Sequence, residues 1–228
     1  MSLLSVFGTK PADSIFNPAT PFAVRLNCQS GQLALSETEF IGNSAEISII
    51  KVARFFGDLG NTKRSEWLQI FYIAAPGCTA LPKDTVCVSY IKTRSLAAFN
   101  QGIIKLIGEG VNPAEGIFTI SFVRHSAGDR NYFSVKFDWR NRTEGVEQEQ
   151  LELIGSFLAT QPGLIDLNGT RQMLSVDGLP SMLIAELVDG CKAQPDEEPA
   201  VILHDLLATA AESLPIPELT ASNGRKRK

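Results

Sequence analysis

Hydrophobic and polar residues alternate most regularly near the middle of the chain, in residues 131–140. Every second residue there is aromatic or β-branched, and most of the residues between them are polar. A period of two residues is typical of a strand with one buried face. Residues 116–124 carry a matching apolar series, and the small and polar residues 126–129 lie between the two stretches. We therefore predict a β-hairpin with an apolar face made of Phe118, Ile120, Phe122, Phe133, Val135, Phe137 and Trp139.

Three earlier strands and one helix are predicted from the same kind of pattern. Residues 47–56, 66–75 and 85–92 are rich in strand-forming side chains and are bounded by Gly, Pro and Asp turn signals. Between residues 95 and 108 the apolar positions recur every three or four residues, which indicates an amphipathic helix. The predicted order is therefore three strands, one helix and two further strands.

The flanks of this stretch are expected to differ from it. Residues 1–45 are interpreted as an N-terminal arm, with a short hairpin formed by strands at 22–27 and 33–35. Residues 144–214 are interpreted as an acidic helical region, and residues 215–228 as a disordered tail with a basic end. Helices are expected at 146–160, 179–188 and 200–213.

Charge is distributed unevenly along the chain, although the net charge of the whole protein is only −4. Residues 46–143 contain thirteen Lys or Arg against eight Asp or Glu, a net charge of +5. Residues 144–224 contain two basic residues against fourteen acidic ones, a net charge of −12, and the last four residues add +4. Such asymmetry indicates that different segments meet different partners, although an acidic helical region can also serve solubility alone.

The element order resembles the OB-fold, a five-stranded barrel that binds oligonucleotides and oligosaccharides. We therefore predict a mainly β protein with α-helix, in which an OB-like five-stranded barrel (β-β-β-α-β-β) at 46–143 precedes a helical C-terminal region. An α+β sheet domain with one crossover helix would give the same order of elements. The closest likeness is to single-stranded DNA-binding proteins of bacteria, phages and plasmids, and 13 of the 18 aromatic residues lie in 46–143.

That resemblance implies a non-enzymatic protein that binds single-stranded nucleic acid, DNA rather than RNA, with low sequence specificity. In such proteins aromatic side chains stack on bases and basic side chains follow the backbone. Tyr132 and Lys136 share one face of their strand, and Trp67 and Phe71 share a face that Gln69 suggests is partly wet. The candidate nucleic-acid-binding residues are Lys51, Arg54, Lys63, Arg64, Trp67, Phe71, Lys92, Arg94, Arg124, Arg130, Tyr132 and Lys136.

The remaining sequence features argue against other classes of function. The four cysteines form no CxxC pair, only two histidines are present, and His125 is interpreted as incidental, so no catalytic residue, metal site or cofactor is predicted. No secretory signal and no membrane-spanning run is visible, which favours a cytoplasmic protein. The alternative function is a structural or adaptor protein that docks partners through its acidic helical region, and a homo-oligomer is compatible with either function.

Overall fold

The computed structural model describes residues 8–9, 14–18, 21–128, 130–160, 173–195 and 197–212. The chain forms two compact units, Met1–Asp177 and Gly178–Lys228, and each is described by itself. The predicted tail at 215–228 lies outside the described residues.

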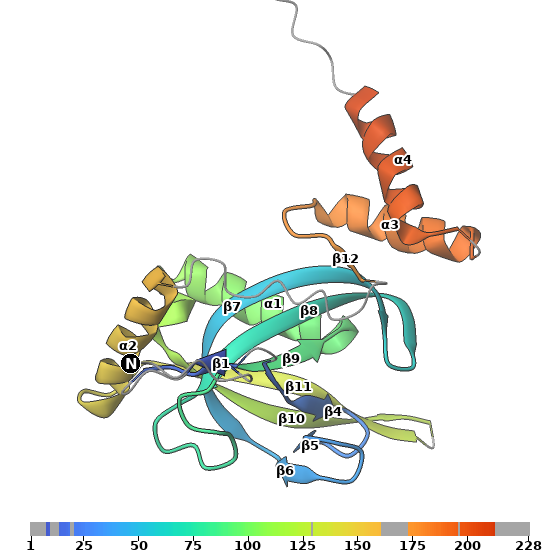
Figure 1. The fold of residues 1–228 in the computed structure, drawn as a ribbon. Coiled ribbons are helices and arrows are strands. Elements are labelled where there is room, and N and C mark those ends of the chain that lie inside the picture. Colours follow the sequence, from blue (N-terminus) through green and yellow to red (C-terminus); the bar gives the residue numbers. More distant parts are fainter. Residues whose placement is uncertain are drawn as a thin grey trace, which may run out of the picture. The chain divides into compact units, whose positions relative to one another are not determined.

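A mixed sheet of seven strands dominates the first unit, and two long curved strands form its centre (Figure 1). β7 (Ala45–Leu59) and β8 (Thr62–Ala74) pair as an antiparallel hairpin. The strand order is β11-β10-β7-β8-β9-β3, and β12 pairs with β7 beside this series. The other strands are β3 (Phe22–Ala23), β9 (Cys87–Ile91), β10 (Ile117–Ala127), β11 (Arg130–Arg140) and β12 (Met173–Ser175).

The prediction of an OB-like five-stranded barrel is wrong, because the sheet is open. In a barrel β9 and β11 would pair, but β3 instead pairs in parallel with the outer edge of β9. The segment after β3 then reaches β11, where the Phe133 amide donates to the Cys28 carbonyl at 2.7 Å. Backbone groups of the N-terminal segment therefore satisfy the edges that a barrel would join to each other.

Shorter strands of the N-terminal segment form two small sheets. β4 (Arg25–Asn27), β5 (Gln32–Ala34) and β6 (Phe40–Gly42) make an antiparallel sheet of three strands. β1 (Gly8–Thr9) pairs with β2 (Asn17–Pro18). The hairpin predicted from strands at 22–27 and 33–35 is present as β4 and β5, but residues 22–23 of the first predicted strand form β3 and pair with β9 instead.

One face of the large sheet packs against helix α1 (Thr93–Gly108), which the 3₁₀ turn η1 (Pro113–Glu115) follows. Leu96 and Phe99 are buried in this core, and the rings of Phe99 and Phe137 meet edge to face at 5.1 Å. The apolar face predicted for the β10–β11 hairpin lies in the same core, so that prediction is confirmed for Phe118, Ile120, Phe122, Val135, Phe137 and Trp139.

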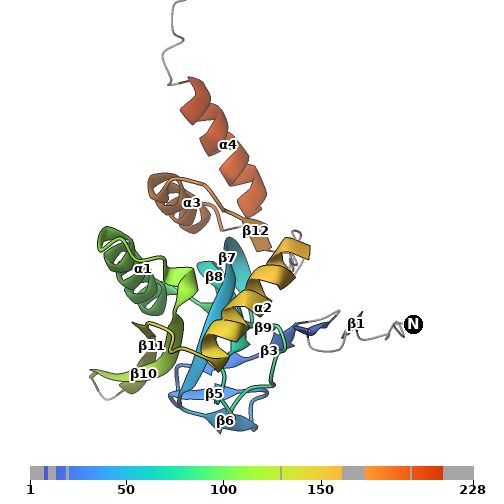
Figure 2. The same ribbon diagram turned by 90° about the vertical axis from the view of Figure 1, so that its left-hand side faces the viewer.

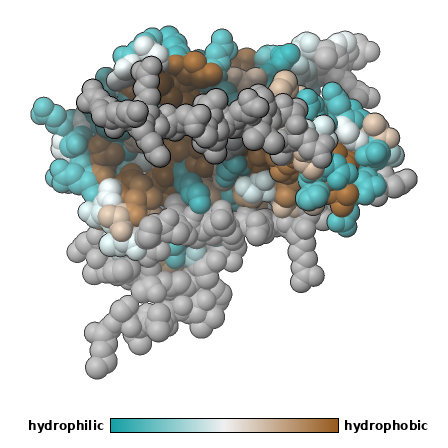
Figure 3. All heavy atoms as spheres, turned by 90° about the horizontal axis from the view of Figure 1, so that it is seen from above, coloured by the Kyte–Doolittle hydropathy of each residue, from teal (hydrophilic) through white to brown (hydrophobic). Residues whose placement is uncertain are grey.

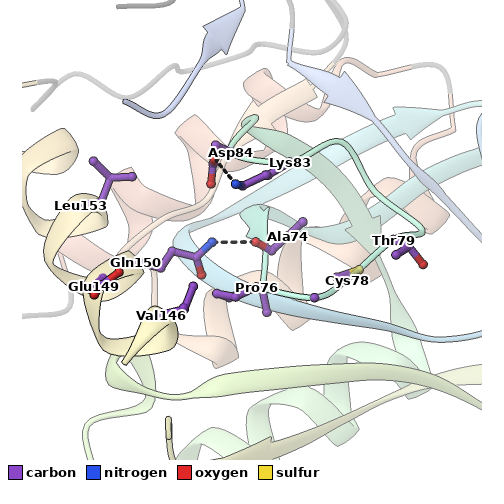
Figure 4. Close-up of a pocket in the computed structure, with 12 residues that line it drawn as sticks. Ala74, Pro76, Cys78, Thr79, Lys83, Asp84, Val146, Glu149, Gln150 and Leu153 are labelled. Atoms are coloured by element: carbon purple, nitrogen blue, oxygen red, sulfur yellow. Dashed lines mark hydrogen bonds and ion pairs between the residues drawn. The ribbon is translucent and has the colours of Figure 1, made fainter. Parts of the chain in front are cut away.

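The other face of the sheet packs against helix α2 (Val146–Thr160), so α1 and α2 lie on either side of β7 (Figure 2). Ile154 and Phe157 are buried against residues of β8 and β9. The Gln150 side chain donates from Nε2 to the Ala74 carbonyl at 2.8 Å (Figure 4). Because α2 packs on the sheet, the division into units falls after Asp177 and not at the change of composition near Thr143.

Two further polar contacts hold the beginning of α2. Arg140 at the end of β11 forms ion pairs with Glu147 on α2 and with Glu46 on β7, at 2.8 and 2.9 Å. The side chain of Glu147 is only 13% exposed, and one of its oxygens also accepts from the Thr143 amide. Arg140 holds the pKa of Glu147 near 2, well below its usual value.

The outer edge of β7 has two different strand neighbours. Near its start, Ala45, Glu46 and Ile47 pair with β10, and near its end Phe55, Phe56 and Gly57 pair with β12. Between these contacts the register of the β7–β8 pairing shifts at Ile49/Lys51, which marks a β-bulge.

The second unit consists of helices α3 (Ser181–Ala193) and α4 (Pro199–Glu212), which pack against each other. Helices were predicted at 179–188 and 200–213; α4 matches its prediction within one residue, whereas α3 continues five residues beyond the predicted end. Gly190 lies so close to the side chain of Ile202 that a Cβ atom there would be 2.8 Å from Cγ2. The buried residues are Ile184, Leu187, Cys191, Ile202 and Leu203.

The surface is mixed in character, and apolar residues are visible between hydrophilic ones in the view from above (Figure 3). No helix in the described part of the chain is long and apolar enough to cross a membrane. Large apolar side chains that are more than 60% exposed are Ile104, Ile107, Val146 and Met182.

Candidate nucleic-acid interface

The tip of the β10–β11 hairpin brings two rings together. Gly128, at φ +59°, begins a tight turn that pairs Ala127 with Arg130. This register places His125 directly opposite Tyr132. The two rings stack with their centroids 5.2 Å apart and their planes inclined by 30°. Side chains opposite each other on one face of an antiparallel pair are close enough for such contact.

Arg94 joins this ring pair from the first turn of α1. Its Nη1 atom lies 2.9 Å from His125 Nδ1, and its guanidinium carbon lies 5.7 Å from the centroid of the Tyr132 ring. On its other side His125 contacts Ser134, with 2.7 Å between Nε2 and Oγ. We call Arg94, His125, Tyr132 and Ser134 the hairpin cluster. Arg94 is exposed and both rings are half-buried, so the cluster can be reached from solvent.

The start of α1 is fixed beside β11 by a buried contact. The Val135 amide on β11 donates to Ser95 Oγ at 2.9 Å. Thr93, the first residue of the helix, has φ +46°, so the chain turns sharply into the helix. Arg94 is next to the anchored Ser95, and this position directs it to the hairpin tip. The predicted N-cap, Ser95, is therefore an anchor between α1 and β11, while Lys92 occupies the N-cap position.

Lys92 adds a second cation at the same end of α1. Its Nζ atom donates to Thr62 Oγ1 and lies 5.0 Å from the centroid of the Trp67 ring. In the described part of the chain, neither Lys92 nor Arg94 has a carboxylate oxygen within 4.0 Å. Two uncompensated cations and the positive end of the helix dipole therefore produce a positive potential next to the ring pair.

Three other predicted basic residues are neutralised by neighbouring carboxylates. Arg54 pairs with Glu66, Lys63 with Asp58 at 2.8 Å, and Lys136 with Asp138 at 2.7 Å. The hydrogen bond from Lys63 lowers the pKa of Asp58. These pairs reduce the field that a phosphate would feel, so these cations contribute less to an interface than Lys92 and Arg94.

The expectation of a partly wet face on β8 is wrong. Phe71 is fully buried and Trp67 is 7% exposed. Gln69 between them is also fully buried, and its Nε2 atom donates to Tyr90 Oη at 2.8 Å. Its polarity therefore serves an internal hydrogen bond, and neither aromatic ring presents a face on which a base could stack.

The remaining predicted residues are dispersed. Lys51 lines an apolar groove of about 290 Å³ between β7 and α1. Arg64 has φ +46°, and its amide donates to Asp58 Oδ1. Arg124 is exposed on the face of β10 opposite to His125. The side chain of Arg130 lies outside the described residues, so the predicted clamp with Arg124 stays a prediction.

Two members of the hairpin cluster, His125 and Ser134, were missed by the sequence interpretation. Assigning 126–129 as a four-residue loop would place His125 opposite Arg130, whereas the two-residue turn places it opposite Tyr132. The dipeptide Gly128-Asp129 is a known signal for tight hairpin turns. Counting the register outward from that dipeptide would have brought His125 and Tyr132 together.

A second hollow of about 290 Å³ lies between α2 and the segment that joins β8 to β9 (Figure 4). Its charged side chains are Lys83 and Asp84, which form an ion pair at 3.8 Å, and Glu149. In the described residues no group of three or more His, Cys, Asp or Glu side chains could hold a metal ion. The hairpin cluster is therefore the better candidate for a binding surface.

Comparisons with protein families, with curated proteins and with solved structures found no match for this chain.

Proposed function

We propose that this protein binds single-stranded nucleic acid, with little sequence preference, at the hairpin cluster and the start of α1. The observation that carries the proposal is the stacked ring pair of His125 and Tyr132 with the exposed guanidinium of Arg94 beside it. A π-face next to a cation suits a base and its phosphate, because stacking accepts any base and the cation meets the backbone charge.

The chemistry favours single strands over duplexes. In a duplex the bases stack on each other, whereas an unpaired base can leave its neighbours and stack on a protein ring. The cluster offers one half-buried ring pair, which suits an unpaired base that stacks on it and not the base edges in a duplex groove. The net charge of +5 in residues 46–143 supports attraction of a polyanion despite the acidic average of the chain.

Fluorescence anisotropy with labelled oligonucleotides tests the proposal. The protein is titrated at several salt concentrations against single-stranded DNA, single-stranded RNA and duplex DNA. Each oligonucleotide is longer than about 16 nucleotides, the upper end of the site sizes known for domains that bind single strands. We expect the single strands to bind more tightly, and we expect affinity to fall as salt rises. Absence of binding to either single strand at low salt would overturn the proposal.

Variants locate the site. Tyr132→Ala is expected to weaken binding by about 1–3 kcal/mol, the usual contribution of one stacked base. Arg94→Ala is expected to reduce the slope of log affinity against log salt concentration by about one, the value for one lost phosphate contact. Lys105→Ala is the control, because Lys105 is 75% exposed near the other end of α1 and pairs with Glu109. If Lys105→Ala weakened binding as much as Arg94→Ala, the attraction would be diffuse and the assignment of this site would be wrong.

A second function is favoured by one observation on the other unit. α3 and α4 expose the apolar side chains of Met182 (71%), Val201 (44%) and Leu207 (41%) in a region rich in acidic residues. A contiguous apolar patch with a polar rim is typical of a protein-binding surface, and we propose that these side chains form one. The same chain could therefore dock a protein partner through this unit. Loss of complex formation with Met182→Glu, while oligonucleotide binding persists, would assign the two functions to separate units.

A further inference from the structure

The hydrogen bonds of His125 define its protonation state. An arginine side chain only donates, so Nδ1 of His125 accepts the hydrogen bond from Arg94 Nη1 and carries no proton. The proton of the neutral ring is then on Nε2, which donates to Ser134 Oγ at 2.7 Å. The contact between Arg94 and His125 therefore exists only while the imidazole is neutral.

Proton uptake by His125 would remove that contact. Both nitrogens of an imidazolium ring donate, so Nδ1–H would face the N–H groups of Arg94, and two positive charges would be adjacent. The other groups around the ring are the phenol of Tyr132 and the hydroxyl of Ser134 on β11, with the Lys136–Asp138 pair further along the same face. No carboxylate oxygen of the described residues lies within 4.0 Å of His125 to neutralise the added charge.

We propose that His125 couples nucleic-acid binding at the hairpin cluster to pH. Proton uptake releases the guanidinium of Arg94 to contact a phosphate and adds one positive charge beside the Tyr132 ring. Binding therefore tightens as the pH falls. The inference rests on the proposed function for the identity of the ligand. By linkage, bound nucleic acid must raise the affinity of the site for the proton by the same factor.

Imidazole nitrogen NMR tests the structural part without any ligand. The chain contains only two histidines, His125 and His204, so the variant His204→Gln assigns both signals. In the neutral ring of His125 we expect the proton on Nε2, and we expect Arg94→Ala to change the Nδ1 signal of His125. A neutral ring with its proton on Nδ1 would overturn the inference, because Nδ1 could not then accept from Arg94.

Binding measured from pH 8 to pH 5.5 tests the functional part. For the unaltered protein and for His204→Gln we expect single-stranded DNA affinity to rise by about threefold or more, within the limit of tenfold per pH unit for one proton. His125→Gln cannot take up the proton, so its affinity is expected to stay flat over this range. If both proteins bound with the same pH dependence, the role of His125 would be refuted while the proposed function stood. If neither protein bound at any pH, the proposed function would be lost and the regulation with it.

Discussion

Glu147 is the residue whose removal should most clearly test how α2 is attached to the sheet. Its carboxylate accepts from both terminal nitrogens of Arg140 and from the Thr143 amide, at 2.7–3.0 Å. Replacing it in Glu147→Gln keeps the size of the side chain but removes the charge. Arg140 then retains Glu46 as its partner, so no cation is left alone.

The expected loss follows from the pKa of Glu147. A fall from 4.5 to about 2 corresponds to roughly 3 kcal/mol at most, at 1.36 kcal/mol per unit. The Arg140 side chain is 35% exposed, so water screens part of this interaction. We therefore expect Glu147→Gln to lower the free energy of unfolding by about 1–2 kcal/mol at pH 7.

The stabilisation that Glu147 contributes should decrease as the pH falls. A carboxylate with a depressed pKa in the folded state stabilises that state above its unfolded pKa, and the stabilisation is lost as pH falls through the folded value. The difference between the two proteins should be complete above pH 5 and should shrink toward pH 2. By linkage, about two fifths of it should remain at pH 3.

Urea unfolding at pH 7, 5 and 3 measures these differences. The only two tryptophans, Trp67 and Trp139, both lie in the first unit, so their fluorescence reports the unfolding of that unit alone. Glu149→Gln on the same helix is the control, since Glu149 is exposed. A loss below about 0.5 kcal/mol at pH 7, or a loss that stayed constant down to pH 3, would refute the reasoning.

The remaining predictions concern packing, and the same unfolding assay tests each of them. Gly116→Ala should lower the free energy of unfolding by about 3 kcal/mol or more, because the new Cβ would lie 2.2 Å from the Trp139 ring and 2.6 Å from a main-chain oxygen. An unchanged free energy of unfolding would show that the ring can move. Gly102→Ala should instead raise the free energy of unfolding by about 0.5–1 kcal/mol, since Gly102 lies within α1 and a Cβ there meets nothing within 4 Å. A lower free energy of unfolding would contradict this prediction. Ser89→Ala should lower the free energy of unfolding by about 1–3 kcal/mol, because the hydroxyl forms hydrogen bonds with both Tyr72 Oη and a buried carbonyl. Adding Tyr72→Phe, which removes the phenol hydroxyl as well, should recover part of this loss.

The strands and the helix between residues 45 and 140 could be predicted from sequence because each depends on its own period. The amphipathic pattern at 95–108 became α1 within two residues, and the alternation at 131–140 became β11. The open sheet could not be predicted, because it depends on a contact between distant segments. β3 is only two residues long, and its parallel pairing with β9 has no local pattern.

At the candidate site, too, the types of residue could be predicted from the sequence, but the contacts between distant segments could not. Arg94 and Tyr132 were identified by residue type, but their proximity depends on the buried hydrogen bond that joins Ser95 to Val135. Trp67 and Phe71 were misjudged because Gln69 was interpreted as a sign of water. A buried amide with an internal partner looks identical in sequence to an exposed one, so only the position of Tyr90 could distinguish them.

The bulge in β7 has a consequence for how the protein behaves at high concentration. In the described chain, β10 covers the edge of β7 only as far as Ile47, and the segment of β12 and the two residues after it begins to cover this edge at Arg54, whose carbonyl accepts from the Val176 amide. The stretch between these contacts lies at the margin of the sheet. A flat, apolar margin is a template on which strands of other molecules can assemble into aggregates. An irregular backbone and a lysine are two devices by which β proteins resist such assembly, and the bulge at Ile49/Lys51 supplies both. We therefore expect this irregularity in the longest strand to disfavour self-association through the backbone at this margin.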